Sequence, residues 1–374
     1  MPCTDVVDMK IRDVKSQLPQ TCIPKARSAR EIEALFHHCP VPDLCQMARD
    51  VCEKVHGTFV YLRGLIEFTN HCTSNCLYCG IRRDNRKVHR FRMNEIQILQ
   101  TIEQGLKLGF KTFVLQGGED PCWTVDRICR LVESIKAATR NQVAVTLSCG
   151  MNSGEEYRRL VTAGADRYLL RFETSDPVLH ARLRDGQTLD QRLEALENIK
   201  AAGFQVGSGF MLGLPGETPK IRLDNLLLCR SLELDMVGIG PFIPHPDTPL
   251  ARERTKRFEY SLQGTALLRL ALPLAHIPAT TAAGSIIENG REQMIQSGAN
   301  VLMPNITPGV FKRAYLLYPG KICIDETGSQ SIERLEKTIP DIGRSLSFER
   351  ADALKLRSSG SDPGRRIPKG GGYG

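Results

Sequence analysis

Short β-branched apolar runs alternate with amphipathic stretches along most of the chain. The amphipathic stretches have the length of helices, and several end at a glycine, such as Gly109, Gly164 and Gly203. The runs that we expect to form strands are residues 58–69, 112–118, 143–149, 167–173, 205–214, 236–242, 277–283 and 299–305.

This alternation predicts an α/β fold with parallel strands. Strands that alternate with helices form right-handed crossovers, and eight such units close a (β/α)8 TIM-type barrel. An open doubly wound sheet is the alternative, but it would carry a glycine-rich phosphate loop after its first strand. Here the first strand leads straight into a group of cysteines. We therefore predict that residues 56–325 form a barrel.

The regions on either side of the barrel differ from it in pattern. Residues 1–55 predict an N-terminal helical extension, in which Ser28 and Glu31 have the spacing of a capping box. Residues 326–357 predict a C-terminal helical segment. Residues 358–374 are poor in apolar side chains and rich in glycine, proline and charge, which predicts a disordered tail.

The composition, 41% hydrophobic and 25% charged, is typical of a globular protein. No run approaches the roughly 18 apolar residues of a membrane span, and the N-terminus lacks the apolar core of a secretory signal. We expect a cytoplasmic monomer without a membrane partner. The net charge is +8, with basic residues gathered in residues 82–92 and in the tail. Such runs are usually solvated surfaces, and docking to an acidic partner is the alternative. No nucleic-acid partner is expected, because stacking aromatics are not interleaved with the basic residues.

The most informative motif is the triplet Cys72, Cys76 and Cys79, spaced C-x3-C-x2-C among thirteen cysteines. Thiolates select iron–sulfur clusters, zinc or Cu(I). Three cysteines leave one iron of a [4Fe–4S] cluster without a protein ligand, so that it can bind a small molecule such as S-adenosylmethionine (SAM). A structural zinc site needs four ligands, and His71 adjoins Cys72 too closely to serve easily as the fourth. Cysteines buried without any ligand are the remaining alternative.

The spacing of this triplet, with an aromatic residue before its last cysteine, resembles the signature of the radical SAM superfamily. The resemblance implies a [4Fe–4S] cluster and SAM as cofactors, with Tyr78 against the adenine. The turn at Gly117, Gly118 and Glu119 is similar to the segment whose backbone meets the SAM amino group in that superfamily.

Longer segments resemble the biotin-synthase-like group and, within it, the HydE family of [FeFe]-hydrogenase maturases. These segments are residues 68–72, 79–85, 115–121, 166–174, 236–249, 277–281 and 303–305. The resemblance implies an enzyme that builds the diiron subcluster of the hydrogenase. It would use a 5′-deoxyadenosyl radical to attack sulfur of a small organometallic substrate, an iron–carbonyl–cyanide–cysteine species. The implied partners are the tyrosine lyase that supplies this substrate, a scaffold GTPase that receives the product, and an electron donor.

The same resemblance implies roles for individual residues. Beyond Tyr78 and the glycine-rich turn, it assigns SAM contacts to Glu173, Arg192 and Met236. The residues that it assigns to substrate in the barrel interior are Thr146, Arg171, Thr280, Thr281, Met303 and Tyr315. Ordinary alternatives remain, since Glu173 and Arg192 could form a structural ion pair. The threonines could be strand formers and the methionines core residues.

The chain also departs from the family pattern, and competing functions remain open. Some relatives hold a second cluster on three cysteines, but only Cys323 is present here, with Ser331 and Arg334 at the other positions, so we predict none. Phe172 replaces a histidine of some relatives. A methylornithine-synthase-like mutase would need a clamp for an amino acid. Biotin synthase would need a second cluster inside the barrel, and a non-catalytic iron–sulfur carrier would bind a cluster without cleaving SAM.

Overall fold

The computed structural model describes residues 24–354, so the predicted disordered tail at 358–374 lies outside the described residues. Its main sheet has the order β2 (Gly64–Thr69), β3 (Thr112–Gly117), β4 (Ala144–Ser148), β5 (Arg167–Leu169), β6 (Gln205–Ser208) and β8 (Met236–Val237). All of these neighbours pair in parallel. The order follows the chain, as expected when each strand is joined to the next by a helical crossover.

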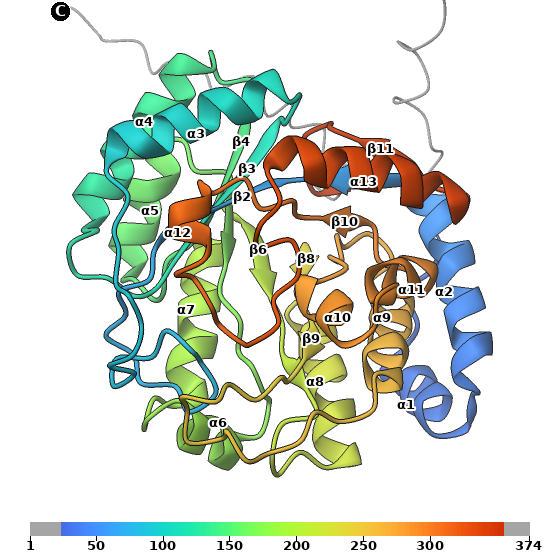
Figure 1. Cartoon of the computed structure of the whole chain (residues 1–374). Helices are drawn as coiled ribbons and strands as arrows, with labels where there is room; N and C mark the ends of the chain where they lie inside the picture. The colour runs from blue at the N-terminus through green and yellow to red at the C-terminus, as the bar shows by residue number, and fades with distance from the viewer. Residues whose placement is uncertain (1–23, 355–374) are drawn as a thin grey trace, which may run out of the picture.

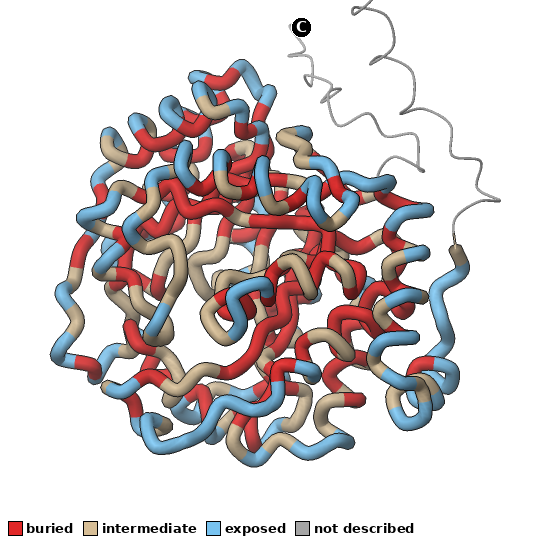
Figure 2. Tube along the Cα trace, turned by 45° about the vertical axis from the view of Figure 1, so that its right-hand side comes forward, coloured by how far each residue is buried: buried red, intermediate tan, exposed pale blue. Residues whose placement is uncertain are grey.

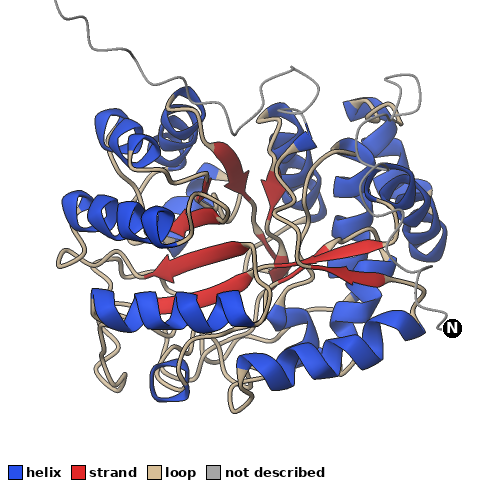
Figure 3. Cartoon of the chain, turned by 90° about the horizontal axis from the view of Figure 1, so that it is seen from above, coloured by secondary structure: helices blue, strands red, loops and turns tan. Residues whose placement is uncertain are grey.

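Isolated parallel bridges close this sheet into a ring. Met236 pairs with His276, Pro278 pairs with Val301 of β10 (Val301–Leu302), and Leu65 of β2 pairs with Asn305. Eight parallel segments therefore surround one interior, and Figure 3 shows them enclosed by helices. The predicted (β/α)8 barrel is confirmed.

Three predicted strands are shorter or more divided than expected. The first is split into β1 (Phe59–Leu62) and β2, because β1 pairs with β10 and with β11 (Ser345–Ser347). The fifth and sixth predicted strands are each interrupted at a glycine, Gly209 and Gly238. Beyond these glycines the two segments pair again, as β7 (Met211–Leu212) and β9 (Gly240–Pro241). At the break, a Cβ on Gly209 would lie 2.0 Å from the carbonyl oxygen of Gly238, so the two backbones could not approach with any larger residue.

The seventh strand is reduced to the paired residues His276 and Pro278. The prediction that Thr280 and Thr281 lie on this strand is wrong, because Thr280 is the N-cap residue of helix α10 (Thr281–Ile286). Pro278 has no N–H to donate to a ladder. The strand therefore ends early, and both threonines stand at its carboxyl end.

Helices cover the outside of the ring (Figure 1). Side-chain caps at Asn94, Ser153 and Thr188 begin three of them, each completing a capping box. The buried residues gather along the strands and the inner helix faces (Figure 2). The surrounding helices are α3 (Glu95–Lys107), α4 (Val125–Ala138), α5 (Gly154–Thr162), α6 (Pro177–Leu183), α7 (Leu189–Ala201), α8 (Pro219–Ser231), α9 (Glu259–Ala271), α11 (Gly290–Gln296) and α12 (Gly309–Lys312).

Both flanking regions are attached to the barrel. Helices α1 (Ala29–His38) and α2 (Val41–His56) pack against α9, and the predicted capping box of Ser28 and Glu31 is present. The C-terminal segment contains one helix, α13 (Gly328–Asp341), and then β11, a strand that the sequence did not predict. Beyond β11, Asp352 forms a 2.8 Å ion pair with the fully buried Arg167 of β5.

Candidate active site

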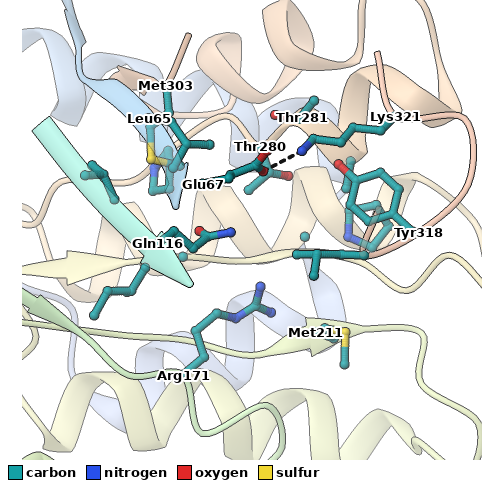
Figure 4. Close-up of a pocket in the computed structure, with 18 of the residues that line it drawn as sticks. Leu65, Glu67, Gln116, Arg171, Met211, Thr280, Thr281, Met303, Tyr318 and Lys321 are labelled. Carbon is teal, nitrogen blue, oxygen red and sulfur yellow. Dashed lines mark hydrogen bonds and ion pairs between the residues drawn. The ribbon is translucent and has the colours of Figure 1, made fainter. Parts of the chain in front are cut away.

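A cavity of about 250 Å³ lies inside the barrel, and its lining includes residues that follow the carboxyl ends of strands, such as Arg171 and Thr280 (Figure 4). Cys79 and Tyr78 line one part of it, so the cysteine loop and the barrel interior share one space. The lining residues include Arg63, Glu67, Tyr78, Cys79, Gln116, Thr146, Arg171, Glu173, Met211, Met236, His276, Thr280, Thr281, Met303, Tyr318 and Lys321. Barrels place their active sites at this end, where residues from several strands converge.

The three cysteines of the triplet follow β2 in one loop. Cys76 is buried, while Cys72 and Cys79 are partly exposed. Burial, followed by the charges of Cys76 and Cys72, raises the pKa of the Cys79 thiol well above its usual range. The backbone N–H of Glu119 donates to the Cys72 sulfur at 3.4 Å. Neighbouring thiols with N–H donors at sulfur fit an iron–sulfur cluster, whose potential such hydrogen bonds help to set.

Within residues 24–354, no group of three or more His, Cys, Asp or Glu side chains is arranged to hold a single metal ion. The cysteine loop differs from such a centre, because each of its thiolates would bind a different iron of a cluster. Its donors are thiolates alone, which suit iron–sulfur chemistry.

Arg90 holds the cysteine loop from beneath. Its guanidinium donates to the carbonyl oxygens of Ile81 at 2.7 Å and of Arg82 at 2.6 Å. The Asn70 side chain accepts from the N–H of Phe91 at 2.8 Å and so ties the two ends of the loop together. The prediction that the basic run 82–92 is a solvated surface is therefore wrong for part of it. The Arg90 guanidinium is occupied by hydrogen bonds to backbone carbonyls of the cysteine loop.

The glycine-rich turn packs directly on the cysteine loop. A Cβ on Gly118 would lie 2.1 Å from the carbonyl oxygen of His71 and 2.8 Å from Cβ of Cys72, so only glycine permits this approach. The N–H of Thr73 donates to the Glu119 carbonyl at 2.9 Å. The predicted turn at Gly117, Gly118 and Glu119 thus lies beside the first cysteine.

Tyr78 lines the cavity beside Cys79. Burial, followed by the charge of Cys76, raises the pKa of its hydroxyl well above the usual value, so the hydroxyl stays protonated. That hydroxyl accepts a hydrogen bond from Arg184 at 3.2 Å. The ring lies against a small apolar cluster that includes Leu183 and Phe242. An aromatic face with apolar backing is suited to a nucleobase.

Glu173 has a positive φ of 68°, a left-handed backbone conformation that residues other than glycine rarely adopt. Its Oε2 lies 3.0 Å from Nη2 of Arg171, so the structural pairing of Glu173 with Arg192 that we considered is not the one observed. Arg192 begins the second turn of α7 and is buried, and its Nε has no hydrogen-bond partner among the described residues. Arg192 is also not among the described residues that line the cavity.

Most of the predicted substrate residues lie together in the wall of the cavity. Thr146, Arg171, Thr280, Thr281 and Met303 all line the cavity, as does Met236 from the predicted SAM contacts. The hydroxyls of Thr146 and Thr280 are buried and have no hydrogen-bond partner within the described chain. Figure 4 shows Arg171 pointing into the cavity toward Gln116. These groups form a polar lining with spare donors and acceptors.

Tyr315 is the exception among the predicted substrate residues. It is buried and is not one of the described residues that line the cavity. Its hydroxyl accepts from Nε2 of Gln116 at 3.3 Å, so it supports a cavity residue from behind. Tyr318, three residues later, faces the cavity in its place.

Sequence reasoning missed a buried ion pair in the cavity wall. The Lys321 ammonium lies 2.5 Å from Oε1 of Glu67, and Asn305 donates to Oε2 of the same carboxylate at 2.7 Å (Figure 4). Glu67 stands in the middle of β2, where all six residues are buried. A lone carboxylate in a buried strand was the signal that could have identified it, because buried charges need partners.

The floor of the cavity also carries basic groups that the sequence did not single out. Arg63 is buried, donates to the Met236 sulfur at 3.0 Å, and has two further nitrogens without a partner among the described residues. Burial, followed by the positive charge of Arg63, lowers the pKa of His276 well below its usual value. His276 is therefore neutral at physiological pH.

Comparisons with known proteins agree with this geometry. The family model of the radical SAM superfamily matches residues 66–229. The [FeFe] hydrogenase maturase subunit HydE of Thermotoga maritima is 47% identical over 301 residues, which is 80% of this chain and 86% of that protein. The chain belongs to the HydE family of radical SAM enzymes.

More distant relatives of the HydE family share the fold. A 3-methylornithine synthase of Methanosarcina acetivorans is 27% identical over 74% of this chain and 75% of that protein. The crystal structure of methylornithine synthase has a TM-score of 0.76 at 24% identity, over 89% of this chain and 97% of that one. A crystal structure of HydG, a maturase of the [FeFe]-hydrogenase, has a TM-score of 0.75 at 19% identity, over 90% and 75% of the two chains. As radical SAM enzymes, members of the family use a [4Fe–4S] cluster and SAM.

Three further residues bear on departures from the family pattern. Phe172 is buried against Phe210, with ring centroids 5.9 Å apart, and is not among the described cavity residues. Near the barrel end, Arg334 donates to the Cys323 sulfur at 2.9 Å, and both Arg334 and Ser331 bind Glu326. The positions of the second cluster in some relatives therefore carry a network of hydrogen bonds and ion pairs here.

No helix of the described chain is long and apolar enough to span a membrane.

Proposed function

We propose that this HydE-family chain matures the diiron subcluster of [FeFe]-hydrogenase. In this proposal it acts on sulfur of an iron–carbonyl–cyanide–cysteine substrate bound in the barrel. The observation that carries the proposal is that Cys79 and Tyr78 line the same cavity as the charged side chains of Arg171 and Lys321. Identity of 47% with the Thermotoga maritima maturase subunit supports it.

The residues present fit a [4Fe–4S] cluster and SAM. Cys72, Cys76 and Cys79 would hold the cluster, which supplies the electron that breaks the sulfonium bond of SAM to yield a 5′-deoxyadenosyl radical. Tyr78 offers an apolar face to the adenine, and the turn at Gly118 brings backbone groups beside the first cysteine. Arg192 keeps an unpartnered buried nitrogen, which suits a carboxylate such as that of SAM.

The cavity residues would bind and orient the substrate. Arg171 offers a buried Nε without a partner among the described residues, and Thr146 and Thr280 offer hydroxyls without a hydrogen-bond partner there. A guanidinium fork binds carboxylates in two parallel hydrogen bonds, and hydroxyls can donate to cyanide nitrogen. The barrel also encloses the cavity, which limits side reactions of a radical formed there.

The partners follow from the same proposal. A tyrosine lyase would supply the substrate, a scaffold GTPase would receive the product, and a one-electron donor would reduce the cluster. The exposed Arg86 and Lys87 continue the cysteine loop at the surface and give an acidic donor a complementary face.

An amino-acid mutase is the second candidate function. The Glu67–Lys321 pair and Arg171 place charges of both signs in the cavity, as a clamp for an ammonium and a carboxylate would require. Similarity to 3-methylornithine synthase at 27% identity is the accompanying observation. A non-catalytic carrier is disfavoured, since it would have no need of a cavity beside the cysteines that is lined by charged groups such as Arg171 and Lys321.

The test offers both classes of substrate to the reconstituted, reduced enzyme with SAM. If the enzyme is a maturase, the product of the tyrosine lyase should accelerate 5′-deoxyadenosine formation. The product that this enzyme makes from it should then activate hydrogenase when the scaffold protein is added. Acceleration by lysine or another free amino acid, with none from the organometallic species, would overturn the proposal in favour of the mutase.

A further inference from the structure

Four side chains from three separate segments form a closed ring beside the cysteines. Ser74 of the cysteine loop donates to Oε2 of Glu119 at 2.8 Å, and Gln187 donates to Ser74 at 3.3 Å. Arg184 completes the ring, since its Nη2 donates to Gln187 at 2.8 Å and lies 3.5 Å from Oε1 of Glu119. The ring joins the cysteine loop, the glycine-rich turn and the connection between α6 and α7.

Arg184 makes contacts that the other ring members lack. Its Nη1 donates to the Tyr78 hydroxyl at 3.2 Å, and its side chain is only 9% exposed. Its Nε is buried without a hydrogen-bond partner among residues 24–354. One residue earlier in the chain, the carbonyl of Leu183 accepts from the N–H of Leu77 at 2.9 Å. The end of α6 therefore holds two neighbouring residues of the cysteine loop, Leu77 through its backbone and Tyr78 through its hydroxyl.

The positive charge of Arg184 also lies beside the cysteine loop. Its guanidinium bonds the hydroxyl of Tyr78, which stands between Cys76 and Cys79 in the chain, and reaches Ser74 of the same loop through Gln187. A nearly buried charge is poorly screened, so its influence on a neighbouring thiolate is strong. The same charge would favour the more negative, reduced state of a cluster held by that thiolate.

We propose that Arg184 is a positioning residue of the cluster site, with two separable effects. Its fork clamps the cysteine loop and Tyr78 onto the glycine-rich turn, and its charge raises the reduction potential of the cluster. The second effect rests on the proposed function, because it requires a bound [4Fe–4S] cluster. The first effect concerns the folded polypeptide alone.

Two variants separate the effects. Arg184→Gln removes the charge and the fork, whereas Arg184→Lys keeps the charge but cannot bridge Tyr78, Gln187 and Glu119 together. Arg182→Gln is the matched control, because Arg182 lies exposed at the end of the same helix and outside the ring. Gln187→Leu weakens the ring while leaving Arg184 in place, and it serves if Arg184→Gln fails to fold.

The first measurement is the rate at which iodoacetamide alkylates Cys72, Cys76 and Cys79 in the full-length protein before reconstitution, read by peptide mass spectrometry. Loss of the clamp should raise that rate by about tenfold in Arg184→Gln and Arg184→Lys, since local opening becomes easier. Gln187→Leu should raise it less, and Arg182→Gln should leave it unchanged. Equal rates in all five proteins would overturn the clamp.

The second measurement is the midpoint potential of the reconstituted cluster, followed by EPR during redox titration. Arg184→Gln should shift it to a more negative value, and Arg184→Lys should stay near the parent. An unshifted potential in Arg184→Gln would overturn the electrostatic effect. If the parent itself bound no cluster, the proposed function would fail, while the alkylation rates would still decide the clamp.

Discussion

Arg171 and Glu173 leave the end of β5 two residues apart, and their charged ends meet again at 3.0 Å inside the cavity. The first was assigned to substrate and the second to SAM, so this contact joins the two halves of the site. Part of the guanidinium remains unpartnered within the described residues and available to a ligand. One side chain can thus hold the Glu173 carboxylate and still have a donor available for a second anion.

Replacing Arg171 should separate substrate binding from SAM cleavage. Arg171→Met removes hydrogen bonds to a charged group, which corresponds to a rise of about 10–100-fold in KM for the substrate. Arg171→Lys should recover part of the loss, since it keeps the charge without the fork. Steady-state kinetics with the lyase product check this, with Arg182→Met as a surface control. An unchanged KM would remove Arg171 from the substrate site.

Arg192→Ala should weaken SAM binding and leave the cluster intact. The residue is buried on α7 with an unpartnered nitrogen, and it lies outside the cysteine loop. Loss of a charge-assisted hydrogen bond should raise the Kd of SAM about tenfold or more. Equilibrium binding of SAM together with the optical spectrum of the cluster checks this. A lost cluster spectrum, or unaltered SAM binding, would contradict the assignment.

The Glu67–Lys321 pair should be strongly coupled in stability. Both groups are nearly inaccessible to solvent, so Lys321→Met leaves a buried carboxylate without its cation and should cost about 3–5 kcal/mol in the free energy of unfolding. The double variant Glu67→Gln with Lys321→Met should be more stable than Lys321→Met alone. Urea unfolding of the parent, Glu67→Gln, Lys321→Met and the double variant under anaerobic conditions measures this double-mutant cycle. Additive effects would show that the two groups do not depend on each other.

The pH dependence of stability should include a contribution from Glu217. Burial raises its pKa from 4.5 to about 7 in the folded chain, because only Gly213 and Arg222 oppose that burial. The unfolded chain therefore binds fewer protons between pH 4.5 and 7, and stability is lost as the pH rises through that range. A tenfold difference in proton affinity between the folded and unfolded chains corresponds to about 1.4 kcal/mol of stability.

Glu217→Gln tests this sign. Its melting temperature relative to the parent should rise from pH 5 to pH 8, because the variant has no proton to lose. The exposed Glu253→Gln provides the control, for which the difference should not depend on pH. A difference for Glu217→Gln that is flat or falls with pH would contradict the raised pKa.

Reversing charge on the cysteine loop should slow an acidic electron donor. Arg86 and Lys87 are exposed on that loop, and Lys87 has only Asp247 within ion-pair distance among the described residues. The double variant Arg86→Glu with Lys87→Glu should reduce SAM cleavage driven by an acidic flavodoxin or ferredoxin at low salt. Cleavage driven by dithionite should not change. Lys54→Glu on α2 is the control, and equal sensitivity of both variants would exclude a docking role for the loop.

The sequence predicted those features whose signal is local. The cysteine spacing predicts a cluster loop because three candidate ligands lie within eight residues. The alternating pattern identified the barrel because each strand is followed by its helix. Features formed by residues far apart in the chain were missed. Arg184 and Glu119, or Glu67 and Lys321, become partners only after the barrel closes. No local pattern indicated that Tyr315 lies outside the described cavity lining and bonds Gln116.

The strands with the fewest ladder hydrogen bonds were the least predictable. The run 277–283 has the composition of a strand, but only Pro278 within it pairs, and its end becomes a helix N-terminus. Strand β11 was not expected, because its pairing with β1 depends on the C-terminal segment returning across the barrel. Tertiary contact decides both cases.

The proposed function depends above all on Cys72, Cys76 and Cys79 holding a cluster that cleaves SAM. The most direct test is an anaerobic one, in which the chain is reconstituted with iron and sulfide, reduced with dithionite and mixed with SAM. The EPR spectrum and 5′-deoxyadenosine are then measured, with Cys76→Ser as the blank. We predict a [4Fe–4S]⁺ signal that shifts on addition of SAM, and 5′-deoxyadenosine in the parent only. A cluster signal indifferent to SAM, or equal 5′-deoxyadenosine from Cys76→Ser, would contradict this prediction.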